Sequence, residues 1–217
     1  MNNNAKLISY SQTQDNKNLL EQVAFVARVS NPSNQYNTDT IERLIHYLIK
    51  HQHWSPFEMV SICIEINTTR DIARQILRHR SFSFQEFSQR YANPLQDLQF
   101  VNREARLQDL KNRQNSIITD DQTLQQEWIE KQEQLTKLST EVYQWAIDHG
   151  IAKEQARAVL PEGNMQSRIY MNGTLRSWIH YIQLRSDIAT QKEHRDVAVA
   201  CAKAIEPIFP MIIEFCN

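Results

Sequence analysis

The sequence predicts a single helix-rich domain that also contains a few β-strands, the composition of an α+β protein. The segment Glu58–Asn67 alternates apolar and polar residues, as a half-buried strand does. Several longer segments repeat apolar residues every three or four positions, as amphipathic helices do. Only three glycines occur, so neither a P-loop nor a dinucleotide-binding glycine motif can form. We expect residues 1–217 to form one domain with a sizeable core.

Composition argues against several function classes. The chain has 24 Lys and Arg against 25 Asp and Glu, and the net charge of −1 provides no bulk attraction to nucleic acid or to an anionic membrane. Three cysteines without a CxxC pair predict a reducing compartment, no disulfides and no zinc site. The N-terminus has no apolar signal core, and no apolar run is long enough to span a bilayer. We therefore expect a soluble cytoplasmic protein without nucleic-acid or membrane partners.

The N-terminal part of the chain predicts two strands with two helices between them. Ala5–Ser11 favours a strand, and Asp15 can cap the helix that follows it. A second helix begins near Asp39 and ends before Pro56, because the residue before a proline disfavours helix. Glu58–Asn67 is the clearest strand of the sequence. Its apolar face, which should contact the core, consists of Val60, Ile62, Ile64 and Ile66.

The segment Thr69–Tyr91 is unusually rich in cations, hydroxyls and aromatic rings. A helix is predicted up to Arg78, with Asp71, Gln75 and Arg78 on its polar face. Cations at the end of a helix complement its dipole, which is a sufficient explanation for an isolated Arg-His-Arg run. Here three phenylalanines are interleaved with the polar residues, which a solvated charged surface does not require. The mixture favours a pocket for an anionic, ring-bearing ligand.

The middle of the chain predicts three more helices. Ser83 and Glu86 have the spacing of a capping box, which predicts a short helix that ends at Pro94. Asp121–His149 predicts a long helix with a polar outer face, suited to packing or oligomerisation. The apolar positions of this long helix are Leu124, Trp128, Leu135, Leu138, Val142 and Trp145. Lys153–Leu160 predicts a short helix that presents Arg157.

The C-terminal part predicts a strand over Met165–Met171, ended by Asn172 and Gly173, and then two helices. The first helix starts at Thr174, and the second spans about Thr190–Ile205. Helical geometry puts four polar residues of the first helix on one stripe and Arg185 on the far side. The stripe consists of Arg176, His180, Gln183 and Asp187. A helix with two polar faces suits a position between two ligand sites or between subunits.

The histidines predict no metal site. His51 and His53 with Glu58 have neither a zinc nor a di-iron spacing, and no further ligands complete a cluster. His180 lies one turn from Arg176, so a functional role and an ordinary structural role both remain open. We expect the following residues at the surface: His46, His149 and His194.

Four motifs, in order, resemble one known family. Arg78-His79-Arg80, followed after seven residues by Ser88, is similar to the signature of the flavin-dependent thymidylate synthases. The resemblance continues in three other segments: His53–Glu58 upstream, Ala156–Pro161 downstream, and Arg176–Asp187 near the end of the chain. It covers about residues 20 to 200, and four motifs in the right order are far more specific than any one of them.

The resemblance implies a FAD-dependent methyltransferase that converts dUMP to dTMP. The family takes its methylene group from 5,10-methylenetetrahydrofolate and its reducing equivalents from NADPH through FAD. It forms homotetramers with shared active sites, and its fold is a helix-rich α+β domain with a small, mostly antiparallel sheet, the thymidylate synthase-complementing type.

The resemblance also implies site residues. Those expected to bind dUMP are Gln75, Arg78, Glu86, Phe87, Ser88, Gln89, Arg90, Arg157 and Arg185. Those expected to bind FAD are Ser55, Arg78, His79, Arg80, Glu86, Thr174, Arg176 and His180. A neighbouring subunit is expected to supply Arg157 and the segment from Glu86 to Arg90. Arg185 is the expected catalytic residue, since a permanently charged guanidinium can stabilise negative charge that develops on the uracil ring.

Cysteine usage agrees with this interpretation. The other route to thymidylate needs an activated cysteine nucleophile, and none of Cys63, Cys201 and Cys216 lies beside a base in the sequence. The chain departs from the family pattern at Thr174 and Ala189, near the flavin contacts, and residues 99–123 match nothing in it. Two alternatives remain: a nucleotide- or flavin-binding protein without turnover, and an RNA-binding helical module, which the net charge disfavours.

Overall fold

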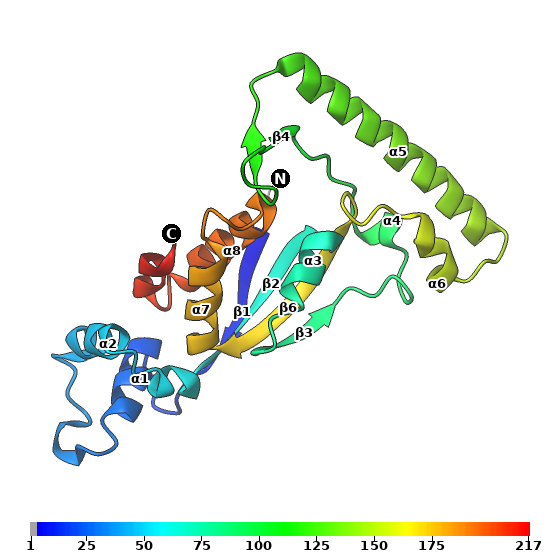
Figure 1. The fold of residues 1–217 in the computed structure, drawn as a ribbon. Coiled ribbons are helices and arrows are strands. Elements are labelled where there is room, and N and C mark those ends of the chain that lie inside the picture. The colour runs from blue at the N-terminus through cyan, green and yellow to red at the C-terminus, as the bar shows by residue number, and fades with distance from the viewer. Residues whose placement is uncertain (1–3) are drawn as a thin grey trace.

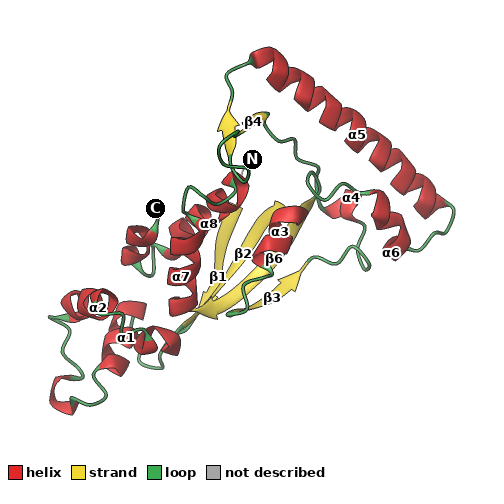
Figure 2. Cartoon of the chain, in the orientation of Figure 1, coloured by secondary structure: helices red, strands yellow, loops and turns green. Residues whose placement is uncertain are grey.

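The computed structural model describes residues 4–217, in which some helices lie beside a small sheet and others lie beyond its ends (Figures 1 and 2). The strands are β1 (Asn4–Tyr10), β2 (Ser61–Thr69), β3 (Phe82–Glu86), β4 (Arg106–Gln108), β5 (Ser116–Ile118) and β6 (Gln166–Thr174). The helices are α1 (Leu19–Ala27), α2 (Ile41–Lys50), α3 (Arg70–Ile76), α4 (Pro94–Asp97), α5 (Gln122–Asp148), α6 (Lys153–Ala156), α7 (Leu175–Arg185) and α8 (Lys192–Ile205). Short 3₁₀ turns are η1 (Pro32–Asn34), η2 (Ser55–Met59), η3 (Arg157–Val159) and η4 (Pro210–Phe215).

The central sheet has the strand order β1-β2-β6-β3, and each neighbouring pair is antiparallel. The predicted alternation in β2 is confirmed, because Val60 and the three isoleucines that follow it at every second position are fully buried. These residues share one apolar cluster with side chains of α3, α7 and α8. The opposite face is polar, with Tyr170 donating to the Glu65 carboxylate at 2.8 Å. The predicted helix-rich α+β fold with a small antiparallel sheet is confirmed.

The segment after α3 differs from its prediction. Phe82–Glu86 is strand β3, which pairs with β6 through Phe84 and Met171, and not the start of a helix. The capping-box spacing describes only local hydrogen bonds, whereas pairing with β6 satisfies this backbone and buries Phe82. Pro94 also has the opposite role to the predicted one, since it is the first residue of α4.

Strand β6 continues through the predicted turn at Asn172 and Gly173 to Thr174. Gly173 pairs with both Ile62 and Phe82 across the sheet. A Cβ at this position would lie 2.6 Å from Cε1 of Phe82, so the glycine makes room for an aromatic ring. At the other end of the chain, Asn18 rather than Asp15 caps α1, in a reciprocal capping box with Glu21.

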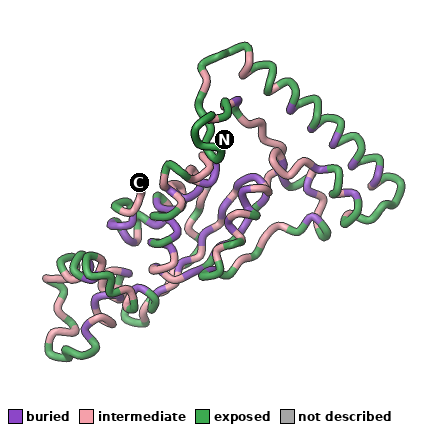
Figure 3. Tube along the Cα trace, in the orientation of Figure 1, coloured by how far each residue is buried: buried purple, intermediate pink, exposed green. Residues whose placement is uncertain are grey.

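Helix α5 has the predicted bounds, with Asp121 as its N-cap and His149 as its C-cap. The prediction of a polar outer face is wrong within one chain, because most of the apolar side chains point outward. The exposed fractions lie between 39% and 59% for Trp128, Leu135, Leu138, Val142 and Trp145. The face turned toward the rest of the chain is largely polar and includes Gln132, Thr136, Ser139 and Tyr143. Figure 3 shows this outward face as exposed along most of the helix.

In residues 4–217, no helix is both long and apolar enough to cross a membrane. The same residues contain no group of three or more histidine, cysteine or acidic side chains placed to bind a metal ion.

Candidate active site

Arg185, the last residue of α7, is held by His79 from the loop after α3. The guanidinium Nε donates to the imidazole Nε2 over 3.0 Å. The ring of His79 also packs edge-on against Tyr181, with 5.0 Å between ring centroids. Burial and then the charge of Arg185 lower the pKa of His79 from 6.5 to about 4. His79 is therefore neutral near pH 7 and can accept the hydrogen bond that orients Arg185.

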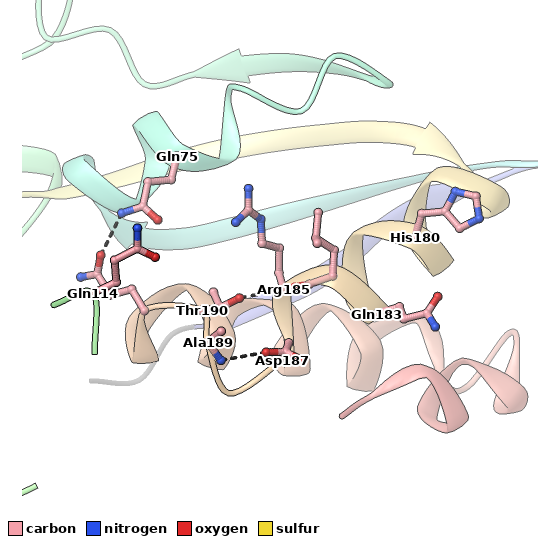
Figure 4. A pocket seen from close by; sticks show the side chains of 10 residues that line it. Gln75, Gln114, His180, Gln183, Arg185, Asp187, Ala189 and Thr190 are labelled. Atoms are coloured by element: carbon pink, nitrogen blue, oxygen red, sulfur yellow. Dashed lines mark hydrogen bonds between the residues drawn. The ribbon is translucent and has the colours of Figure 1, made fainter. Parts of the chain in front are cut away.

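A cavity of about 650 Å³ opens beside Arg185 (Figure 4). Its walls come from α3, from α7 and the loop between α7 and α8, and from the turn of the β4–β5 hairpin, which contributes Gln114. Six polar residues are central to its lining: Gln75, His180, Gln183, Arg185, Asp187 and Gln191. The predicted separation of Arg185 from the polar stripe of α7 is wrong, because Arg185 lines this one cavity together with His180 and Gln183 of the stripe. The helix ends at Arg185, and the chain then curves around the opening.

Gln75 belongs to a polar network that runs from the cavity lining into the buried interior. Its Nε2 donates to Oε1 of Gln191 at 2.9 Å, and its Oε1 lies 3.1 Å from Nδ1 of His194. The other ring nitrogen of His194 lies 3.2 Å from the hydroxyl of Tyr181. Burial, followed by the charges of Arg185 and His79, lowers the pKa of His194 to about 3. This histidine is therefore neutral at physiological pH.

The predicted surface position of His194 is wrong, since its side chain is fully buried. A signal was present in the sequence: Val197, Ala198 and Cys201 follow His194 at helical spacing and are also buried in α8. The preceding Glu193 is 5% exposed and forms an ion pair of 2.5 Å with Arg106 of β4. The hairpin for which the sequence suggested no role is thereby attached to the helix that supports the cavity.

The residues expected to bind FAD come from η2, the loop after α3, the end of β6 and α7, and Glu86 belongs to β3. Arg176 forms an ion pair with Glu58, and the side chain of Thr174 caps α7. The ring of His180 packs edge-on against Trp54 at 4.9 Å. Burial and the charge of Arg176 lower the pKa of His180, so a neutral ring is favoured there.

Three more residues of this group are exposed: Ser55, Arg78 and Arg80. Within residues 4–217, neither Arg78 nor Arg80 forms an ion pair with a carboxylate. Two unpaired guanidiniums, a hydroxyl and aromatic surface suit a cofactor that carries a diphosphate and flat rings. The residues present therefore fit FAD.

The other residues expected to bind dUMP gather elsewhere in the chain. Glu86 accepts from Ser167 at 2.7 Å and pairs with Arg70 at 3.4 Å. Arg90 is not one helical turn from Glu86, as predicted, and instead pairs with Glu154 of α6 at 3.4 Å. Among the described residues, the segment 86–90 and Arg157 do not line the cavity beside Arg185. Of the residues predicted to bind dUMP, only Gln75 and Arg185 thus line this cavity, among residues 4–217.

Comparison with known proteins agrees with the fold and the motifs. Residues 6–211 match the sequence model of a family described as thymidylate synthase complementing protein. A probable flavin-dependent thymidylate synthase of Paramecium bursaria Chlorella virus 1 is 49% identical over 213 residues, 96% of each chain. A flavin-dependent thymidylate synthase of Synechocystis sp. is 48% identical over 190 residues, 88% of this chain and 86% of that one.

Solved structures show the same fold. A crystal structure of the UMP/dUMP methylase PolB from Streptomyces cacaoi, bound with 5-Br dUMP, has a TM-score of 0.78 with this chain. The match covers 99% of this chain and 94% of that one at 24% sequence identity, so it supports the fold alone. Together with the family match over residues 6–211, these likenesses establish that the chain belongs to the thymidylate synthase complementing protein family.

Proposed function

We propose that this chain is a flavin-dependent thymidylate synthase, an enzyme that methylates dUMP to dTMP. The observation that carries the proposal is the cavity at the end of α7, where neutral His79 orients the guanidinium of Arg185. The relatives at 48% and 49% identity bear this enzyme's name and cover nearly the same length. One domain spanning residues 1–217 would carry the activity.

The flavin is FAD, held by the exposed cations Arg78 and Arg80 together with residues of α7 and η2. When bound, FAD supplies hydride transfer to the pyrimidine. The reductant is NADPH, and the one-carbon donor is 5,10-methylenetetrahydrofolate. The relatives' printed names support the flavin, and the other two substrates follow from the resemblance of the motifs.

Arg185 binds the edge of the uracil ring and stabilises negative charge that develops on it. His79 engages Nε, and within residues 4–217 the two terminal nitrogens of Arg185 form no hydrogen bond, which leaves them to the ligand. A preoriented cation at a half-buried position stabilises such charge without reorganisation of solvent. Gln75 and Gln191, which also line the cavity, offer amide groups for other polar atoms of the nucleotide.

No cysteine nucleophile is required in this scheme. Cys201 is fully buried, and burial raises the pKa of its thiol far above the usual range. Burial also raises the pKa of Cys63, which faces away from the apolar core of β2. All three cysteines are free thiols, which supports a reducing compartment, and we propose the cytoplasm.

The second group of nucleotide-binding residues, from Glu86 to Arg90 with Arg157, completes the site of a neighbouring subunit in a homotetramer. The arrangement is supported by the finding that, among the described residues, this group does not line the cavity of Arg185 in its own chain. The exposed apolar face of α5 supports it too, since an apolar stripe along a 27-residue helix favours burial against another chain. Ser88 and Arg90 would then bind the phosphate region of dUMP.

The decisive experiment follows NADPH oxidation and tritium release from [5-³H]dUMP by the purified, FAD-loaded protein. NADPH oxidation that depends on dUMP and folate, with matching tritium release, is the expected result. Binding of FAD and dUMP without tritium release would instead identify a nucleotide- and flavin-binding protein without turnover. Growth of a thymidine-requiring bacterial strain without thymidine would be independent support.

A further inference from the structure

Five side chains behind the cavity form one continuous hydrogen-bonded chain. From one end to the other they are Glu193, Gln191, Gln75, His194 and Tyr181. All four links measure between 2.9 and 3.2 Å. Only the two glutamines reach the cavity, since Glu193, His194 and Tyr181 are at most 5% exposed.

For most of these five groups, chemistry alone does not decide which one donates and which one accepts each hydrogen bond. A glutamine amide can turn over, a neutral histidine has two tautomers, and a tyrosine hydroxyl can donate or accept. If every group reversed, Tyr181 would accept from His194 and Gln75 would present its oxygen to Gln191. Both directions of donation satisfy the same distances, so a group that can only donate or only accept must decide between them.

Glu193 makes that selection. Burial by itself raises the pKa of Glu193, but hydrogen bonds from its own backbone and from Gln191, with the charges of Arg106 and Arg103, outweigh burial and leave the pKa below its usual value. An ionised carboxylate only accepts. Gln191 must therefore turn its Nε2 to Glu193, 2.9 Å away, and its Oε1 to Gln75.

The remaining links follow in order. Since Gln191 offers an oxygen, Gln75 donates from Nε2, which leaves its Oε1 facing His194. His194 then carries its proton on Nδ1, and its bare Nε2 accepts from the hydroxyl of Tyr181. Burial raises the pKa of this hydroxyl well above its ordinary value, so the hydroxyl keeps its proton. Figure 4 shows the first of these bonds leaving the amide nitrogen of Gln75.

We propose that Glu193 and His194 are positioning residues, which hold the Gln75 carboxamide in one orientation so that the cavity meets dUMP with a fixed arrangement of donor and acceptor. The identity of the ligand rests on the proposed function, whereas the direction of hydrogen-bond donation between these five side chains does not. An amide that is already fixed does not have to be ordered when the nucleotide binds, so binding costs less conformational entropy. The benefit therefore appears in the affinity for the nucleotide and not in the rate of the chemical step.

The first test measures the tautomer directly. A long-range ¹⁵N–¹H correlation spectrum of protein labelled with ¹⁵N-histidine should show His194 protonated at Nδ1 and bare at Nε2 at pH 7. Loss of the signal in His194→Gln assigns it. In Glu193→Gln the selecting carboxylate is absent, so the other tautomer should also be populated. A native protein with the proton on Nε2 would overturn the proposal, whether or not the protein is active.

The second test measures dUMP affinity by titration calorimetry. His194→Phe keeps a flat ring but removes both hydrogen bonds, and should raise the Kd for dUMP about two- to tenfold, the worth of one net hydrogen bond. The turnover number at saturating dUMP and the flavin content should stay unchanged. His194→Gln can donate to Gln75 and accept from Tyr181, so it should restore most of the affinity.

The matched control is His46→Phe on α2, where the histidine is exposed and remote from the cavity lining. Native affinity in a folded His194→Phe would remove the positioning role. If His194→Phe does not fold, the tautomer of the native protein still decides the direction of the chain. A protein that binds no dUMP at all but shows the proton on Nδ1 of His194 would contradict the proposed function. The proposed direction of the hydrogen bonds would still hold.

Discussion

Arg185 and His79 form a hydrogen bond of 3.0 Å in which a permanent cation donates to a neutral imidazole. This bond requires a neutral imidazole, because a protonated histidine would repel the guanidinium and would have no free lone pair on Nε2. Partial burial and the arginine charge keep His79 neutral, and the bond in turn holds the guanidinium of Arg185 at the edge of the cavity. The two residues therefore depend on each other, and four predictions follow from them and from the fold around them.

Replacing Arg185 by alanine should leave FAD bound and reduce tritium release from dUMP by about a hundredfold or more, the usual effect of removing one preorganised charge donor. The measurement is the steady-state rate of tritium release with the flavin absorbance recorded in parallel. Arg43→Ala, at an exposed position of α2, is the matched control and should keep the native rate. Normal turnover in Arg185→Ala would remove this residue from the catalytic role.

Acid should destabilise the folded protein through His79. Its pKa is about 4 in the fold and 6.5 in an ordinary setting, so above pH 6.5 both the folded and unfolded states are neutral. As the pH falls toward 4, only the unfolded state binds the proton, and the free energy of unfolding must decrease. His194, with a pKa of about 3, acts in the same direction.

Urea unfolding at pH 7 and pH 4.5 measures this loss. His79→Gln should show a smaller loss between the two pH values than the native protein. His149→Gln, which changes an exposed residue at the end of α5, should show the native loss. Equal losses in all three proteins would mean that His79 does not contribute to acid sensitivity.

Gly173→Ala should destabilise the protein by about 1–3 kcal/mol, the range observed for extra atoms in a packed core. The added Cβ would lie 2.6 Å from Cε1 of Phe82, between β3 and β6. Chemical denaturation gives the free energy of unfolding. Gly163→Ala is the control, because nothing lies within 4 Å of a Cβ at that position. Combining Gly173→Ala with Phe82→Leu should recover part of the loss.

Leu138→Glu, in the middle of the exposed apolar face of α5, should dissociate the proposed homotetramer and abolish dUMP-dependent activity with it. The reason is that a charge would have to be buried between subunits. Sedimentation velocity and activity should be measured on the same sample. Leu110→Glu, at a 95% exposed position of the β4–β5 hairpin, should keep both. An active, correctly assembled Leu138→Glu would place the interface elsewhere.

Several parts of the fold could be predicted because the relevant pattern is local. The alternation from Val60 to Ile66 reports directly on which side of β2 is buried. The bounds of α5 follow from a cap at Asp121 and a glycine after His149, whose effects act within one turn.

Other parts could not be predicted, since they depend on distant segments. The capping-box spacing at Ser83 favoured a helix, but pairing with β6, nearly ninety positions later, made this segment a strand. The apolar face of α5 was recognised correctly, whereas the side turned to the chain was not, because periodicity does not identify the surface that covers a helix.

The candidate site also has features that depend on the local sequence and features that depend on distant segments. The sequence by itself determined the motif of Arg78, His79 and Arg80, the presence of Arg185 and the absence of a glycine-rich nucleotide loop, since these are matters of residue type and spacing. Only the tertiary structure joined His79 to Arg185 and buried His194 behind Gln75. The physical reason is that hydrogen-bond partners and burial are set by contacts of α3 and the loop after it with α7 and α8, which follow about a hundred residues later in the chain.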